Sequence, residues 1–245
     1  MVRSRTHGLI VGWGMIGNYH AARRAYWFGR YNRAVEFCAR ADFHKCDNLR
    51  ARILNPDEHY TKILARYHRR HKPRCYLEIG VEQGTTLRLS AAQTTVGVDP
   101  APQCEGPGTL YRMTSDEFFA KHSPLYQPDM AFIDGSHRFE DALRDFINLE
   151  RIMNPQGVIF IHDALPLDER TATKERHTQF WSGDIWRLFL LLWEKRTDLS
   201  FHLFRSPPTG LLMVSSLDPG ACRLQHDYTQ LVMEYNAVPF AARIR

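Results

Sequence analysis

Four short apolar runs, each with a carboxylate at or near its end, constrain the fold of this 245-residue chain more than any other feature. The four carboxylates are Glu78, Asp99, Asp134 and Asp163. Runs of this length that alternate with helical patterns predict a mostly parallel, doubly wound α/β sheet. In such sheets ligands bind outside the carboxyl ends of the strands, where the strand order reverses. We therefore expect the four acids to lie in one crevice.

The expected strands and the helices between them account for most of the chain. The strands cover residues 75–80, 95–99, 110–113, 129–134, 158–162, 201–204 and 211–214. Helices are expected over residues 55–71, 84–92, 139–153 and 184–195, with a further one beginning near Thr114. A Pro-rich turn joins the last two strands and predicts a closing antiparallel hairpin in a seven-stranded sheet. Residues 164–182 form a long polar loop, and loops of this length are often functional.

Composition divides the chain into three parts. Residues 1–57 are aromatic and arginine-rich and predict a mainly helical extension, either a lid or a dimer contact. Residues 58–218 hold the α/β domain, and residues 219–245 are expected to form a C-terminal tail. Residues 1–76 carry 16 lysines and arginines against 5 acids, whereas the rest carries 16 against 22. Because the basic residues are scattered among apolar ones, we interpret them as a solvated surface and expect no nucleic-acid partner.

Cysteine usage and hydropathy indicate a cytoplasmic protein without a membrane partner. The five cysteines are scattered without a C-x-x-C pair, a distribution typical of reduced thiols. Cys38, His44 and Cys46 would be the ligands of a zinc site, but their spacing matches no standard pattern. No apolar run approaches the roughly 20 residues that a membrane span requires.

Residues 12–17 match G-x-G-x-x-G, the glycine pattern of dinucleotide-binding folds. That motif also needs a βαβ unit with an acid about 20 residues further on, at the end of a second strand. Glu36 stands near that distance, but no third strand is expected before residue 55. We interpret Gly12–Gly17 as a turn before a helix and keep a nicotinamide-dependent oxidoreductase as the least favoured alternative.

Residues 58–218 resemble class I S-adenosylmethionine-dependent methyltransferases. Residues 77–84, LEIGVEQG, are similar to the first motif of that superfamily. Residues 132–141 and 154–163 resemble a bacterial subgroup that contains sugar O-methyltransferases of macrolide biosynthesis and cephalosporin-tailoring proteins. The resemblance implies a Rossmann-like fold and S-adenosyl-L-methionine as cofactor. It also implies methyl transfer to a hydroxyl of a sugar or secondary metabolite, so that the expected partner is a small-molecule acceptor.

The resemblance further implies which residues bind the cofactor. Gly80 and Gly84 would let the backbone approach the ligand closely. N–H groups at the start of the helix expected after Gly84 suit the carboxylate of the cofactor. Glu78 is expected to meet the ammonium group, directly or through water, and Asp99 to accept both ribose hydroxyls. The remaining residues implied are Thr85, Thr86, Ser115, Asp116 and Asp134, of which Ser115 and Asp116 lie where the family binds adenine.

His137 is the expected catalytic base, with Asp134 beside it. Imidazole titrates near neutral pH and can remove the acceptor's proton, as a histidine at this point does in the resembling sugar O-methyltransferases. The alternative is that His137 caps the following helix. Asp134, His162 and Asp163 are the expected ligands of a divalent cation, although Asp163 could instead orient His137. Carboxylates suit Mg²⁺, whereas an imidazole in place of the family's first acid suits Mn²⁺, iron or zinc better.

Several alternatives remain open at this point. Trp181 and Trp186 flank a polar turn and either floor an acceptor pocket or pack in the core, with Asp184 as a helix cap. A homo-oligomer is an open alternative. An RNA methyltransferase would require an RNA-binding module, and we recognise none in the sequence. A non-catalytic protein that binds S-adenosylmethionine is the remaining alternative.

Overall fold

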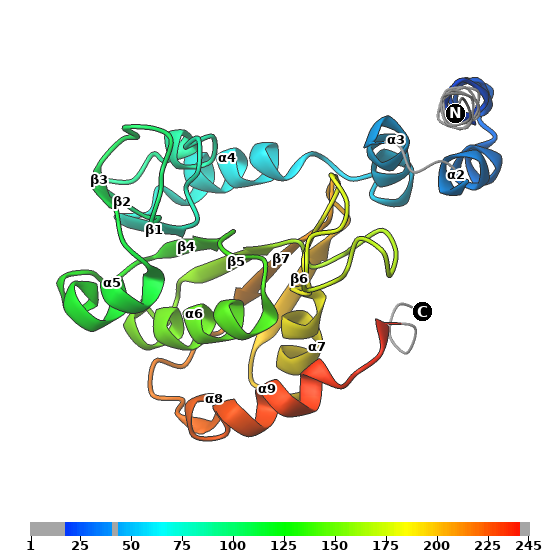
Figure 1. Ribbon diagram of the computed structural model, residues 1–245. Helices are drawn as coiled ribbons and strands as arrows, with labels where there is room; N and C mark the ends of the chain where they lie inside the picture. The colour runs from blue at the N-terminus through cyan, green and yellow to red at the C-terminus, as the bar shows by residue number, and fades with distance from the viewer. Residues whose placement is uncertain (1–17, 41–43, 241–245) are drawn as a thin grey trace, which may run out of the picture.

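The computed structural model describes residues 18–40 and 44–240 and centres on one seven-stranded sheet (Figure 1). The strand order is β3-β2-β1-β4-β5-β7-β6. Strands β1 to β5 pair in parallel, and β7 pairs antiparallel with both β5 and β6. The predicted doubly wound sheet with a closing hairpin is therefore confirmed. The strands are β1 (Cys75–Ile79), β2 (Thr94–Val98), β3 (Thr109–Tyr111), β4 (Met130–Ile133), β5 (Val158–His162), β6 (Ser200–Phe204) and β7 (Leu211–Ser215).

Helices cover both faces of the sheet, with α4 on one side and α5, α6, α7 and α9 on the other (Figure 1). The α-helices are α2 (Tyr31–Ala39), α3 (His44–Leu54), α4 (Tyr60–His71), α5 (Ser115–Lys121), α6 (Phe139–Ile152), α7 (Trp186–Lys195), α8 (Arg223–His226) and α9 (Tyr228–Asn236). Residues 18–27 are also helical. Two 3-10 turns, η1 (Leu87–Leu89) and η2 (Ser123–Leu125), complete the elements.

Alternation along the central strands divides the core between these two layers. All five residues of β1 are buried. Successive side chains of a strand point to opposite faces, so Leu77 packs with the α6 and α7 layer while Tyr76 packs with α4. The apolar stripe predicted on residues 139–153 is buried along α6 as expected. This burial on both faces explains why the strands read as nearly continuous apolar runs.

The helix predicted over residues 84–92 is wrong, because this stretch contains only the single turn η1. Glu82 and Gly84 both have positive φ, so the chain turns twice directly after β1. Ser90 is already extended on the way to β2, which leaves no room for a longer helix. The N-terminus of a full helix, which we expected to face the carboxylate of the cofactor, is therefore not formed here.

The C-terminal segment is part of the α/β domain rather than a separate tail. Leu224, Leu231 and Tyr235 are buried in the same core as α6 and α7. Helix α4 also begins later than predicted, at Tyr60, after a short linker that follows α3. Nearly continuous apolar runs made the strands easy to predict, whereas the short helices α8 and α9 have only weak periodicity.

The N-terminal extension is helical, as predicted, and has a small core of its own made by Ala22, Cys38 and Cys46. Burial raises the pKa of the Cys38 thiol to about 12, so this thiol stays protonated and packs as an apolar group. The G-x-G-x-x-G segment lies outside the described residues. Within residues 18–40 and 44–240, no helix is long and apolar enough to cross a membrane.

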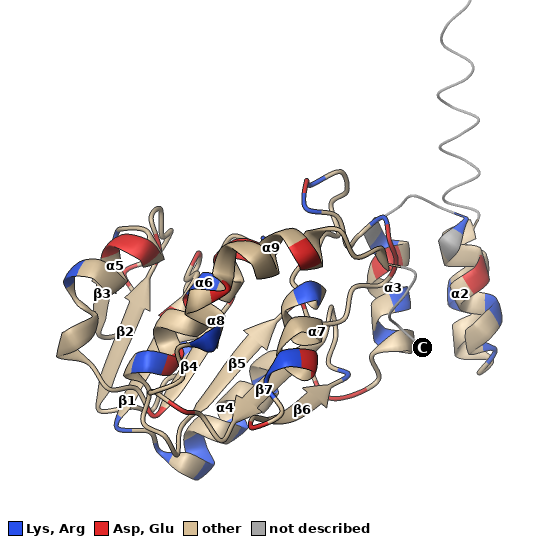
Figure 2. Ribbon diagram, turned by 90° about the horizontal axis from the view of Figure 1, so that it is seen from below, with Lys and Arg blue, Asp and Glu red and all other residues tan. Residues whose placement is uncertain are grey.

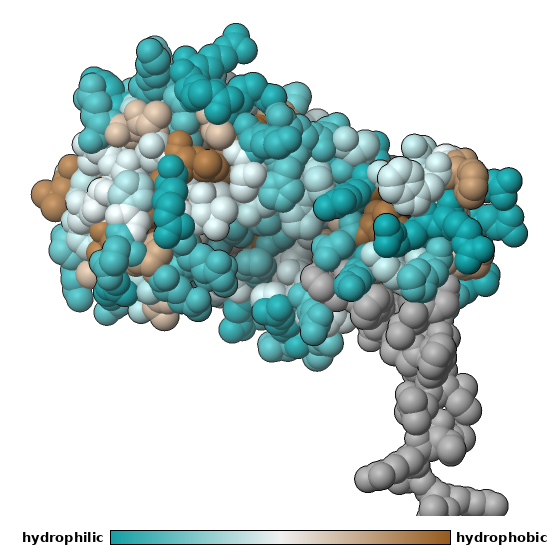
Figure 3. Space-filling view, turned by 90° about the horizontal axis from the view of Figure 1, so that it is seen from above, coloured by the Kyte–Doolittle hydropathy of each residue, from teal (hydrophilic) through white to brown (hydrophobic). Residues whose placement is uncertain are grey.

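The surface of the molecule is mixed in charge and mostly hydrophilic. Figure 2 shows basic and acidic residues side by side on most of the labelled helices, including α3. Figure 3 shows one face on which apolar residues form only small groups. Among the described residues, the most exposed large apolar side chains are Trp27 and Phe28 of the extension, at 76% and 75% exposure.

Candidate active site

A cleft of about 770 Å³ opens at the carboxyl ends of the parallel strands. Its walls come from the loops after β1, β2, β3 and β4 and from loop 164–182. Most of the predicted cofactor-binding residues line it, namely Gly80, Thr85, Thr86, Asp99, Ser115, Asp116 and Asp134. Glu78 and Gly84 do not belong to its lining.

Gly80 allows the loops after β1 and β4 to meet at the floor of the cleft. Its φ is +84°, a conformation that side chains other than glycine rarely adopt. A Cβ at this position would lie 1.9 Å from the backbone oxygen of Asp134. Glycine is therefore required here for two independent reasons, conformation and close approach.

Glu78 lies beneath the cleft rather than in it. Its side chain is fully buried and accepts hydrogen bonds from the hydroxyls of Tyr76 and Thr86, both at 2.6 Å. Burial raises the pKa of Glu78 to about 8. Of the two contacts expected with the ammonium group, direct or through water, this arrangement favours the one through water. Glu78 reaches the cleft only through Thr86, which lines it.

Asp99 organises the loop after β1 from the end of β2. One carboxylate oxygen accepts the backbone N–H groups of Val81 and Glu82, both at 2.9 Å, and the other accepts that of Ala101 at 2.7 Å. A carboxylate offers about four acceptor positions. Asp99 thus retains roughly one for a ligand in the cleft, fewer than two ribose hydroxyls would use without rearrangement.

The residues expected on the adenine side, Ser115 and Asp116, lie at the start of α5. Thr114 and Glu117 form a capping box at the helix start that was predicted near Thr114. Asp116 pairs with Arg144 of α6, whose Nε lies 2.6 Å from the carboxylate. Asp145, the next residue of α6, is 4% exposed, and burial raises its pKa to about 7.

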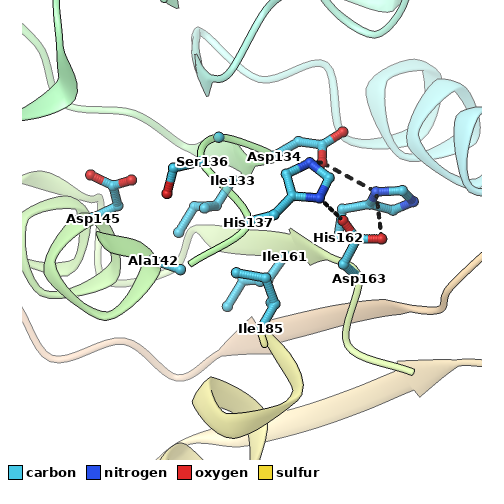
Figure 4. A pocket seen from close by; sticks show the side chains of 11 residues that line it. Ile133, Asp134, Ser136, His137, Ala142, Asp145, Ile161, His162, Asp163 and Ile185 are labelled. Atoms are coloured by element: carbon cyan, nitrogen blue, oxygen red, sulfur yellow. Dashed lines mark hydrogen bonds and ion pairs between the residues drawn. The ribbon is translucent and has the colours of Figure 1, made fainter. Parts of the chain in front are cut away.

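His137 and the acids of β4 and β5 form a compact cluster (Figure 4). His137 Nδ1 lies 2.9 Å from Asp163 Oδ2, and its Nε2 lies 3.5 Å from Asp134 Oδ1. His162 Nδ1 lies 3.2 Å from Asp134 Oδ1 and 3.5 Å from Asp163 Oδ1. The hydroxyl of Thr209 also donates to Asp163. The structure therefore brings together the predicted base and all three predicted metal ligands.

The charge balance of this cluster decides the protonation of His137. Burial alone would lower the pKa of His137, but the carboxylates of Asp163 and Asp134 outweigh burial and raise it to about 9. The same acids raise the pKa of His162 against the opposing effect of burial. With the two acids ionised, the His137 imidazole is therefore protonated at neutral pH.

Asp134, His162 and Asp163 fit a divalent cation by their donor atoms. One ligand atom from each residue lies within 4.8 Å of the others. His162 Nε2 is buried and has no hydrogen-bond partner among the described residues. Two carboxylates with one imidazole form a set that suits Mn²⁺ better than Mg²⁺.

Loop 164–182 places an aromatic wall against His137. The rings of Trp181 and His137 are stacked, with their centroids 5.2 Å apart and their planes 10° apart. Gly183 allows this approach, because a Cβ there would lie 1.8 Å from the backbone oxygen of His137. Trp186 is buried in the core, so the two tryptophans have different roles.

Asp184 is a helix cap, but it caps α6 rather than the helix that follows it, α7. Its carboxylate accepts the backbone N–H of Phe139, the first residue of α6, at 2.7 Å. The N-cap of α7 is Ile185, without a side-chain hydrogen bond. The helix after β4 is therefore capped by a residue 45 positions away, which leaves the His137 side chain facing the cleft.

Sequence reasoning missed several residues of this cleft. Tyr60 lies over His162, with ring centroids 4.3 Å apart, and also lines the cleft. Arg144 and Arg176 line it as well. Tyr60 begins α4, which precedes the whole α/β pattern, so no local motif marks it. Arg144 belongs to the polar face of α6, where its charge resembles ordinary solvated surface.

The fold and the site together define a class of protein. The mostly parallel seven-stranded sheet with its closing hairpin, the glycine turn after β1 and the acids at successive strand ends are the features predicted for a class I methyltransferase. Residues 65–164 match the family model described as a methyltransferase domain. The prediction of a methyltransferase is therefore confirmed for this part of the chain.

Solved structures with a similar fold include three methyltransferases. The methyltransferase PaMTH1 of Podospora anserina, bound to S-adenosylhomocysteine, has 11% identity and a TM-score of 0.49, over 89% of this chain and 99% of that one. The O-methyltransferase TomG of Streptomyces achromogenes, in complex with S-adenosylmethionine, has 15% identity and a TM-score of 0.46, over 65% and 80%. The mycinamycin-pathway methyltransferase MycE, in complex with magnesium, S-adenosylhomocysteine and mycinamycin VI, has 18% identity and a TM-score of 0.45, over 66% and 49%. A comparison with curated proteins found no match.

Proposed function

We propose that this protein transfers the methyl group of S-adenosylmethionine to a hydroxyl oxygen of a small acceptor, such as a sugar or another secondary metabolite. The observation that carries this proposal is the position of His137. Its imidazole lies in the cleft that Asp99 and Gly80 line, between two carboxylates and under the ring of Trp181.

The cofactor would lie along the floor of the cleft. Gly80 opens the floor, and Asp99 at the end of β2 keeps an acceptor position for the ribose. Ser115 and Asp116 form the wall where the adenine would lie. Because no full helix follows Gly84, the backbone N–H groups of the loop itself and the hydroxyls of Thr85 and Thr86 are the donors available for the cofactor's carboxylate.

His137 would remove the proton of the acceptor hydroxyl as the methyl group is transferred. Methyl transfer needs alignment of the acceptor oxygen, the methyl carbon and the sulfur, and a base within hydrogen-bond reach. A base must be unprotonated, so the charge of Asp134 and Asp163 has to be offset. A divalent cation held by Asp134, His162 and Asp163 would supply that offset and polarise the acceptor hydroxyl. Trp181 would form the wall against which the acceptor ring packs.

The test is a methyl-transfer assay with radiolabelled S-adenosylmethionine against a panel of sugars and polyhydroxylated metabolites, with Mn²⁺, with Mg²⁺ and with a chelator. Label transferred to an acceptor oxygen, and reduced by the chelator, would support the proposal. Binding of S-adenosylhomocysteine without transfer to any acceptor would instead favour a non-catalytic cofactor-binding protein.

A further inference from the structure

Four charged side chains join the N-terminal extension to loop 164–182. Asp47 and Arg50 come from α3 and are only 2% and 6% exposed. Arg50 donates to the carboxylate of Asp168 at 2.7 Å. Arg170 donates to the carboxylate of Asp47 at 2.8 Å. In Figure 1 the yellow-green loop lies directly below α3, which agrees with these contacts.

The four charges alternate in sign, so that each buried charge has an opposite partner. Arg50 also lies 3.4 Å from Asp47 of its own helix, which closes the cluster. An ion pair that is removed from water adds little net stability, but loss of one partner leaves the other buried and unpaired. Such a cluster therefore selects one position of the loop against α3.

The loop transmits this position to the stacked pair in the cleft. Asp168 Oδ1 accepts the backbone N–H of Thr171 at 3.0 Å. The carbonyl oxygen of Thr171 in turn accepts the backbone N–H of Ser182 at 3.0 Å and its hydroxyl at 2.9 Å. Trp181, next to Ser182, donates from its indole nitrogen to the carbonyl of Thr173 at 2.6 Å.

We propose that Asp47 and Arg50 are positioning residues of the acceptor site, which hold loop 164–182 so that Trp181 stacks on His137. Helix α3 of the extension then holds loop 164–182, which forms one wall of the cleft, in a fixed position. The role in an acceptor site rests on the proposed function, whereas the coupling from α3 to the stacked pair rests on the contacts alone.

The test follows the imidazole signals of His137 by NMR in protein with ¹³C-labelled histidine, assigned through His137→Gln. Trp181→Leu defines the signal position without the ring current of the indole. In Arg50→Met we expect the His137 signal to move most of the way to that position, whereas Arg50→Lys retains the wild-type signal. Arg196→Met is the matched control, because Arg196 forms a similarly buried pair with Glu150, at 2.7 Å, on another part of the domain.

A second measurement decides the case if Arg50→Met does not fold. Arg170→Gln removes a partly exposed partner, and hydrogen exchange of the Ser182 and Asp184 amides should become about tenfold faster, equivalent to about 1.4 kcal/mol. A His137 signal and exchange rates unchanged from the wild type would overturn the proposal. Neither measurement uses a ligand, so failure to bind S-adenosylhomocysteine would refute the proposed function alone.

Discussion

His137 and Asp163 both have left-handed backbone conformations, with φ of 59° and 63°, and they meet through a 2.9 Å contact between Nδ1 and Oδ2. They follow the ends of neighbouring strands β4 and β5. A left-handed conformation costs a residue other than glycine about 1–3 kcal/mol and persists where the surroundings impose it. Two such residues in contact indicate that the surrounding fold holds this pair in one geometry.

Replacement of His137 by glutamine should reduce methyl transfer by about 10²- to 10⁴-fold, because a positioned base typically contributes that much. Binding of S-adenosylhomocysteine should change little, since His137 lies beyond the cofactor's expected position. Steady-state kinetics and calorimetry on the same preparations measure both quantities. Ser136→Ala is the matched control, because Ser136 lies in the same loop and its hydroxyl hydrogen-bonds to Asp141 and to the backbone N–H of Arg138. An unchanged turnover in His137→Gln would show that His137 is not the base of the reaction.

Replacement of His162 by aspartate should shift metal preference towards Mg²⁺. The substitution exchanges an imidazole donor for a carboxylate, and carboxylates suit Mg²⁺ better than imidazole does. Calorimetric titration with MnCl₂ and MgCl₂ measures the ratio of the two affinities. We expect this ratio to fall by at least about tenfold in the variant, as the donor set becomes all oxygen. An identical ratio in both proteins would contradict the assignment of His162 as a ligand.

Replacement of Gly80 by alanine should destabilise the protein by about 3 kcal/mol or more, because it combines a left-handed φ with a backbone clash. Gly29 is the matched control, with φ of +68° and no heavy atom within 4 Å of the position that a Cβ would take. Gly29→Ala should therefore cost only the conformational part, about 1–2 kcal/mol. Urea unfolding measures both. Equal losses would show that the close approach to Asp134 carries no energetic weight.

Acid should destabilise the protein through His68 of α4. This side chain is 1% exposed, has no hydrogen-bond partner on either ring nitrogen among the described residues, and burial lowers its pKa to about 4. Because the unfolded chain binds the proton more readily, stability is full above about pH 6.5 and is lost as the pH falls towards 4.

At pH 5 the loss from His68 amounts to about 2 kcal/mol relative to pH 7.5, and His68→Leu should abolish it. Urea unfolding at both pH values measures the difference. His71→Gln, an exposed change on the same helix, should retain the full acid sensitivity. If His68→Leu loses as much stability at pH 5 as the wild type, the buried imidazole is not the cause.

Sequence patterns predicted those features that depend on residues close together in the chain. The β strands and the helix start near Thr114 depend on neighbours along the chain and lie as expected, whereas Glu78, one of the four strand-end acids, lies beneath the cleft. The stack of Trp181 on His137 joins residues far apart in the chain and depends on Gly183, so no spacing rule predicts it. The hydrogen bond from Thr86 to Glu78 escaped prediction in the same way. The helix expected after Gly84 is not formed, and the chain turns so that Thr86 reaches Glu78 of β1.

The charged cluster between α3 and loop 164–182 was equally hidden in the sequence. Asp47 and Arg50 stand in a basic, aromatic-rich segment whose charges we interpreted as solvated surface. Arg50 pairs with Asp168, 118 positions away, and Asp47 pairs with Arg170, 123 positions away. Only the three-dimensional structure distinguishes these two buried charges from the exposed ones around them.

The most direct test of the account is calorimetric titration of the purified protein with S-adenosylhomocysteine, beside the variant Asp99→Ala. We predict micromolar binding to the wild type and its loss in the variant, because Asp99 shapes the loop after β1 and, in the proposed function, would accept a ribose hydroxyl. No binding to the wild type, with or without Mn²⁺ or Mg²⁺, would contradict the assignment of this cleft to S-adenosylmethionine.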